Sequence, residues 1–107
     1  MNLIGGEELK EKLDRGDDFK LVMVLGDWHF QAMHIPTSIN INSPDVVAQM
    51  LDPNDEIVVY CSGELCAASI FAYKRLVAQG YQNVRRYAGG VADWREAGYP
   101  MEGEMYQ

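Results

Sequence analysis

Short apolar runs alternate along this chain with amphipathic segments, a pattern that predicts strands alternating with helices. Residues 20–25 (KLVMVL) are almost continuously apolar, which is typical of a strand covered on both faces in a parallel sheet. Further strands are expected over residues 38–41, 56–60 and 84–87. Helices are expected over residues 7–13, 67–80 and 91–97, with Gly16, Gly80 and Gly98 at their ends. The order of these elements predicts an α/β fold with a mostly parallel sheet.

One more helix is predicted from its start signal. Ser43 is a good N-cap and Pro44 suits the first helical position, so a helix should begin there and fade near Leu51. The cluster Asp52-Pro53-Asn54-Asp55 is then a turn. The chain contains no repeat, low-complexity stretch or linker, and residues 1–107 are therefore interpreted as one domain.

Composition and charge exclude several classes of function. The 107 residues are 48% hydrophobic, which is ordinary for a soluble protein, and the net charge is −7. Acidic residues are spread along the chain, which argues against binding to nucleic acid and to anionic membranes. No apolar run approaches the ~20 residues of a membrane span, and the N-terminus lacks the features of a signal peptide. A cytoplasmic location is the resulting expectation.

Cys61 occupies the most informative position in the sequence. It follows four apolar β-formers and precedes a short loop and the helix expected from Ala67. The free N–H groups and the dipole of a helix N-terminus stabilise a thiolate there. Cys61 is therefore the predicted catalytic nucleophile, although a buried core cysteine is the alternative.

A second cysteine, Cys66, lies five positions further on, and its role stays open between three interpretations. It could resolve a persulfide or sulfenate on Cys61 as a disulfide. It could be a small residue packed at the helix start, or it could be the sulfur acceptor itself while Cys61 is packed. Two histidines and two cysteines at these spacings do not fit a zinc site, and neither a metal nor another cofactor is expected.

Three blocks together resemble the single-domain rhodanese-like sulfurtransferases. The first block is residues 34–41 (HIPTSINI), and the second is residues 57–61 (IVVYC), which lead to the cysteine. The third comprises residues 80–84 (GYQNV) and 87–100 (YAGGVADWREAGYP), similar to the family's Gly-Gly-x-x-x-Trp ending. With the N-terminal helix, the resemblance covers nearly the whole chain.

The resemblance implies a central, mostly parallel sheet of about five strands with helices on both faces. It also implies that a thiolate takes a sulfane sulfur from a donor such as thiosulfate, forms a persulfide and passes the sulfur to a nucleophile. Backbone N–H groups of a cradle-like loop would stabilise the thiolate and the anionic donor. On this chain, that cradle is Ser62, Gly63, Glu64, Leu65, Cys66 and Ala67.

The chain departs from the family pattern in three ways. Its loop reaches Gly80 with about two more residues than expected, and it resembles a longer-loop subgroup that carries a second cysteine. The loop has no basic residue and contains Glu64, so an anionic donor gains no side-chain charge there. The family's Asp-x-Arg after the first strand is replaced by Met23-Val24-Leu25.

Residues outside the loop are expected to be mainly structural. His34 should hold its turn through a hydrogen bond, His29 should be exposed, and Trp94 should lie in the core. Trp28 could line the mouth of a pocket or simply pack. The arginines are expected to be solvated, unless one of them leans toward the loop and replaces the missing charge; they are Arg75, Arg85 and Arg86.

Three functions compete on this basis. The leading hypothesis is a sulfurtransferase that uses a small sulfur donor such as thiosulfate or a persulfide, and a protein could serve as the acceptor. The alternatives are a non-catalytic rhodanese-like module that binds a partner protein, and a thiol redox switch that uses Cys61 and Cys66. A related phosphatase needs Cys-x5-Arg, but position 67 is alanine. The acidic surface would steer a basic partner toward the chain.

Overall fold

Four parallel strands form the sheet of the computed structural model, which describes residues 1–42, 46 and 49–105. In spatial order the strands are β2 (Ile39–Asn40), β1 (Lys20–Met23), β3 (Ile57–Tyr60) and β4 (Val84–Tyr87). The predicted parallel α/β sheet is confirmed, with four strands in place of about five. Three of the four are shorter than expected, and β4 has the predicted bounds.

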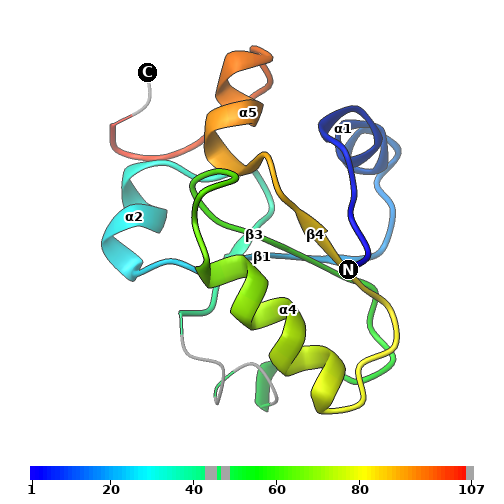
Figure 1. The fold of residues 1–107 in the computed structure, drawn as a ribbon. Coiled ribbons are helices and arrows are strands. Elements are labelled where there is room, and N and C mark those ends of the chain that lie inside the picture. Colours follow the sequence, from blue (N-terminus) through cyan, green and yellow to red (C-terminus); the bar gives the residue numbers. More distant parts are fainter. Residues whose placement is uncertain (43–45, 47–48, 106–107) are drawn as a thin grey trace.

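Helices cover both faces of the sheet. They are α1 (Gly6–Arg15), α2 (Asp27–Ala32), α4 (Ala68–Ala78) and α5 (Gly90–Glu96). Figure 1 shows α1, α2 and α5 on one side of the strands and α4 on the other. Among the described residues, no helix is long and apolar enough to cross a bilayer.

The N-terminal helix ends as the sequence predicted, because Gly16 adopts a left-handed conformation with φ of 73° and its N–H binds the carbonyl of Leu13. The residue pattern does not predict α2, because none of the residues of this helix is buried and it has no apolar stripe. The predicted cap Ser43 and the first position Pro44 lie outside the described residues.

Alternate side chains of β3 point to opposite faces of the sheet and belong to two separate layers of the core. Ile57 and Val59 pack on the α4 side with Leu76, whereas Val58 and Tyr60 pack on the side that holds Trp94. Cys61 continues the first set and packs with it, 1% exposed. The period of two therefore directs the side chain of Cys61 toward α4.

The order of the strands fixes the place of the cysteine loop. The two central strands are β1 and β3. The chain passes from β1 to the outer strand β2 on one side of the sheet, and from β3 to the outer strand β4 on the other side. Ligands of open α/β sheets bind beyond the carboxyl ends of the strands at such a switch of direction. Cys61, directly after β3, lies at that point.

The first block of the family resemblance is tied to the central strand by buried hydrogen bonds. The backbone N–H of Ile35 donates to the Tyr60 hydroxyl at 3.0 Å, and Ser38 Oγ lies 2.8 Å from the same oxygen. Burial raises the pKa of Tyr60 to about 12 despite these hydrogen bonds. This network holds the chain before β2 against the end of β3.

Candidate active site

The cysteine loop joins β3 to α4 and is held from outside by α5. The backbone N–H groups of Val91 and Ala92 donate to the carbonyl oxygens of Cys61 and Ser62, at 3.0 and 2.9 Å. Gly90, with φ of 60°, allows this approach. The family's Gly-Gly turn therefore fixes the first half of the loop by means of the first turn of α5.

The side chain of Cys61 is buried, but its sulfur lies close to polar groups. Its Sγ lies 3.3 Å from Ser69 Oγ and 3.5 Å from the carbonyl oxygen of Cys66. Burial raises the pKa of Cys61, as does the neighbouring Cys66, and the hydroxyl and N–H of Ser69 offset only part of this. The expected low-pKa thiolate at position 61 is thus not what this geometry produces.

Cys66 is the more acidic of the two thiols. Burial raises its pKa, but hydrogen bonds from the Cys61 thiol, from the N–H groups of Ala68 and Ser62 and from the Ser62 hydroxyl lower it overall. Cys66 is also partly exposed, in contrast to Cys61. One N–H group of the loop and the first N–H group of α4 therefore favour an anion at Cys66, whereas that anion was expected at Cys61 from the sequence.

The two cysteine side chains shift each other's pKa in opposite directions, upward for Cys61 and downward for Cys66. A coupled pair loses its protons in two steps that belong to the pair. The opposite directions of the two pKa shifts favour Cys66 as the site of the first negative charge. Both cysteines are free thiols in this structure.

The rest of the loop faces solvent. Leu65 is 102% exposed, and Ser62, Glu64 and Ala67 are exposed as well. Gly63 is partly buried against α5, where an added Cβ would lie 3.6 Å from the Cβ of Ala92. Glu64 is thus free to be solvated, which weakens its repulsion of an anion to ~1 kcal/mol at 4 Å in water.

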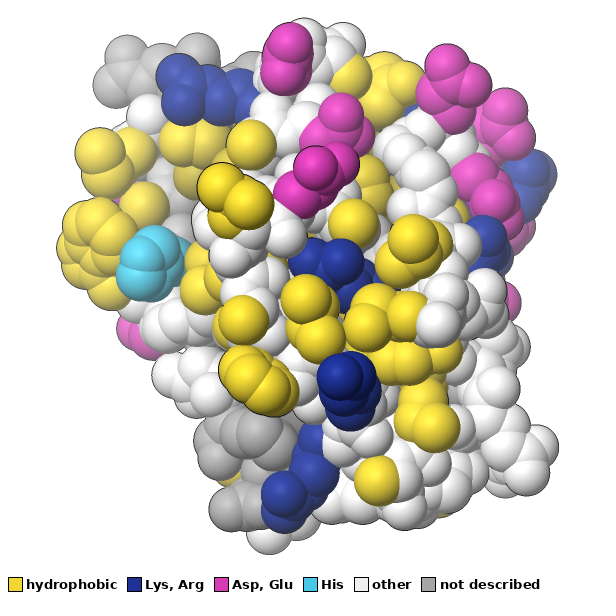
Figure 2. Space-filling view, viewed as in Figure 1, with side chains coloured by type: hydrophobic (Ala, Val, Ile, Leu, Met, Phe, Trp, Pro, Cys, Tyr) yellow, Lys and Arg dark blue, Asp and Glu magenta, His cyan; other side chains and the backbone are white. Residues whose placement is uncertain are grey.

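Two cavities flank the loop. One of about 220 Å³ lies between Ser62, Trp28 and Met105 and is almost wholly apolar, so Trp28 lines a pocket rather than packing inside. The other, of about 320 Å³, lies between Glu64, Gly89 and Asp93. Figure 2 shows hydrophobic side chains gathered over α4 and α2, and acidic ones over α1 and α5.

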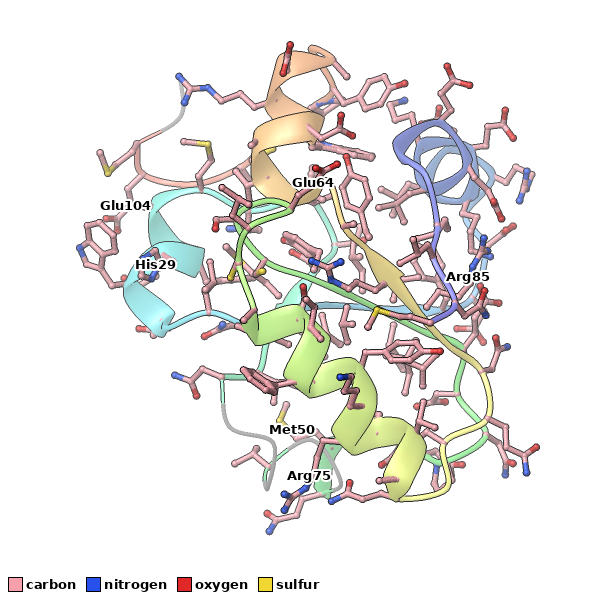
Figure 3. All side chains as sticks on the ribbon, in the orientation of Figure 1. His29, Met50, Glu64, Arg75, Arg85 and Glu104 are labelled. Carbon is pink, nitrogen blue, oxygen red and sulfur yellow. The ribbon has the colours of Figure 1, made fainter. Side chains whose placement is uncertain are left out.

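Arg86 is the arginine whose position differs from the solvated one that was mainly expected. It is only 7% exposed, its Nε donates to Ser69 Oγ at 2.8 Å, and its Nη2 lies 3.5 Å from the carbonyl oxygen of Glu64. Figure 3 shows that Arg85 and Arg75 lie away from Glu64. Of the three arginines, Arg86 is therefore the one that leans toward the loop.

The histidines and Trp94 have structural surroundings. His34 Nδ1 donates to the carbonyl of Phe30 at 2.7 Å and its ring stacks on the Phe30 ring, as expected for a residue that holds the turn. His29 is exposed, and Trp94 is buried. Within residues 1–42, 46 and 49–105, no three His, Cys, Asp or Glu residues are grouped to hold a metal ion.

The chain is similar in sequence to known proteins. The chain is 32% identical over 97 residues to an HTH-type transcriptional regulator of Mycobacterium tuberculosis, covering 89% of this chain and 42% of the regulator. It is 38% identical over 58 residues to thiosulfate sulfurtransferase 18 of Arabidopsis thaliana, covering 54% of this chain and 41% of that protein. The chain thus spans less than half the length of each of these relatives.

Solved structures show the same fold. The rhodanese-like domain of an Anabaena protein superposes with a TM-score of 0.87 at 24% identity, covering 98% of this chain and 81% of that one. A thiosulfate sulfurtransferase of Pseudomonas aeruginosa superposes with a TM-score of 0.85 at 24% identity, covering 96% of this chain and 20% of that one. Residues 6–97 match the family profile described as the rhodanese-like domain, and the chain belongs to that family.

Proposed function

We propose that the chain is a sulfurtransferase that moves a sulfane sulfur from thiosulfate or a persulfide to a thiophilic acceptor. The observation that carries this proposal is the pair of free cysteines in the loop after β3, of which the partly exposed Cys66 has a lowered pKa. The named sulfurtransferases among the relatives support the same class of reaction, at modest identity and partial coverage.

The proposed reaction has two halves. A thiolate of the pair attacks the outer sulfur of thiosulfate, a cysteine S–S bond forms, the donor's S–S bond breaks, and sulfite leaves with the electron pair. The acceptor then attacks the outer sulfur of the persulfide, and the cysteine leaves as a thiolate. Hydrogen bonds from the loop stabilise the charge on sulfur in both halves.

Cys61 is our assignment for the carrier of the persulfide, because it has the strand-end position of the family's nucleophile. Because the pKa of Cys66 is lowered and that of Cys61 is raised, we assign the Cys66 thiolate as the base that takes the proton of Cys61 as Cys61 attacks. Because Cys61 is 1% exposed, the donor must displace the Cys66 side of the loop to reach it. Cys66 as the carrier is the alternative, favoured by its exposure.

Product release from single turnovers tests the function and the assignment together. Wild type, Cys61→Ser and Cys66→Ser are each mixed with excess thiosulfate, and sulfite is measured; glutathione release is measured with glutathione persulfide. We expect a burst near one equivalent for wild type, none for Cys61→Ser and a slower burst for Cys66→Ser. The reverse order of the two variants assigns the persulfide to Cys66, and no release from wild type with either donor contradicts the function.

A thiol redox switch is the second candidate, since two free cysteines five positions apart in one loop, each of which shifts the pKa of the other, can form a disulfide. Mild oxidation of wild type would then remove two hydrogens from the intact mass, and either serine variant would abolish the loss. If neither sulfur donors nor oxidants change the protein, the non-catalytic binding module is the remaining hypothesis.

The partners and location follow from the same proposal. A small sulfur donor is the first substrate, and a protein acceptor with a basic surface is favoured by the net charge of −7. We retain the cytoplasm as the expected location, where thiols stay reduced.

A further inference from the structure

Neighbouring arginines on β4 face opposite sides of the sheet. Arg85 points toward α1, where it makes a two-pronged ion pair with Glu8 at 2.6 and 2.9 Å. Arg86 shares the other side with Val84 and contacts Ser69, near the start of α4. Because successive residues of a strand face opposite sides of the sheet, the guanidinium of Arg86 lies on the α4 side, under the cysteine loop.

Arg86 carries a buried charge that no carboxylate neutralises. Its hydrogen bonds go to the neutral Ser69 hydroxyl and the carbonyl of Glu64, and it makes no ion pair with any residue of the described ranges 1–42, 46 and 49–105. Burial of an unpaired charge is unfavourable, so the fold retains this residue at a cost. A buried cation in such surroundings attracts an anion that forms nearby.

Ser69 connects this charge to the sulfur of Cys61. It is 1% exposed, and its Oγ lies 2.8 Å from Arg86 Nε and 3.3 Å from Cys61 Sγ. A guanidinium only donates hydrogen bonds, so Arg86 occupies a lone pair of the hydroxyl oxygen. The hydroxyl proton is then free to be donated to the sulfur once the sulfur loses its own proton.

We propose that Arg86 and Ser69 are positioning residues that stabilise the anionic sulfur of Cys61, first as a thiolate and then as a persulfide. Arg86 orients and polarises the Ser69 hydroxyl, and Ser69 donates to the sulfur. In this way a residue of β4 supplies the positive charge that the loop itself lacks. The inference rests on the proposed function for its purpose, but the thiolate can be measured without any sulfur transfer.

Titration of a single thiol is the test. In a Cys66→Ser background, the ultraviolet absorbance of the Cys61 thiolate is followed against pH, with Cys61→Ser/Cys66→Ser as the blank. The variants are Ser69→Ala, Arg86→Met, Arg86→Lys and Ser69→Ala/Arg86→Met. The matched control is Arg85→Met, which removes the neighbouring guanidinium on the opposite face.

Loss of one charge-assisted hydrogen bond should raise the midpoint of the Cys61 titration by about one pH unit, a tenfold reduction of the thiolate fraction at pH values below that midpoint. We expect this reduction in Ser69→Ala and in Arg86→Met, with no further reduction in the double variant because Arg86 acts through Ser69. Arg86→Lys should recover part of it, and Arg85→Met should match the background.

An Arg86→Met profile that matches Arg85→Met, even with a lowered unfolding midpoint, would show that Arg86 is structural only. If Arg86→Met does not fold, the Ser69→Ala variant decides alone. A titration equal to that of the Cys66→Ser background would refute the proposed roles of Arg86 and Ser69. Failure of sulfur release in wild type would leave this titration unaffected, so the two proposals fail separately.

Discussion

Gly90 lies where α5 touches the cysteine loop, and its replacement by alanine tests how the loop is held. The residue has φ of 60°, a conformation that favours glycine. A Cβ there would lie 2.4 Å from the carbonyl oxygen of Cys61 and 2.8 Å from the backbone nitrogen of Gly63. These neighbours are backbone atoms, which cannot move aside as a side chain can.

The expected loss of unfolding free energy for Gly90→Ala has two parts. The left-handed conformation costs an alanine roughly 1–2 kcal/mol, and the overlap adds about 1–3 kcal/mol. Gly98→Ala is the matched control, because φ at Gly98 is 76° and an added Cβ would meet no atom within 4 Å. The control should therefore lose only the conformational part.

Urea unfolding of both variants gives the comparison, with the slope m checked to be unchanged. Gly90→Ala should be less stable than Gly98→Ala by about 1–3 kcal/mol. It should also make Cys61 react faster with a small alkylating reagent, because the loop is pushed outward. Equal stability of the two variants, within about 0.5 kcal/mol, would refute the proposed contact between α5 and the loop.

Three further predictions concern the core and the thiols. Tyr60→Phe should lower the free energy of unfolding by about 1–3 kcal/mol at neutral pH, because it leaves buried hydrogen-bonding groups unsatisfied. The raised folded pKa of Tyr60, about 12, means that this contribution is fully present below the unfolded value of 10.0 and disappears as pH rises from there to 12. The wild-type and Tyr60→Phe stabilities, compared by urea unfolding, should therefore converge in that window, and a constant gap would contradict the shift. Trp94→Phe should cost about 1–3 kcal/mol by the same measurement, because the carbonyl of Pro100 loses its donor at 2.7 Å; an unchanged midpoint would contradict this. Iodoacetamide should label Cys66 at least tenfold faster than Cys61 in the folded protein, by mass spectrometry of the single-serine variants, and equal rates would contradict the difference in burial.

Much of the fold could be predicted because parallel strands are buried on both faces and so read as apolar runs. The strand before Cys61 is one example, since Ile57, Val58, Val59 and Tyr60 are all buried. Helix α2 could not be predicted in this way. None of its residues is buried, so no apolar stripe marks this helix in the sequence.

The candidate site was predictable in position but not in electrostatics. Strand and helix signals placed Cys61 at the end of the central strand. The acidity of the two thiols depends instead on where individual N–H groups of the loop point, and no residue pattern encodes this. For Arg86 a signal did exist, since Val84 two positions earlier is an apolar residue on the same strand face. The residue's charge nevertheless led to the expectation of a solvated side chain.

The central claim is that one thiol of the loop takes up one sulfane sulfur, and the intact mass of the protein tests it most directly. After treatment with thiosulfate or glutathione persulfide, wild type should gain the mass of one sulfur atom, and a reducing thiol should remove it. The gain should be absent from Cys61→Ser/Cys66→Ser. An unchanged mass of wild type with both donors, or an equal gain in the variant that lacks both cysteines, would contradict the account.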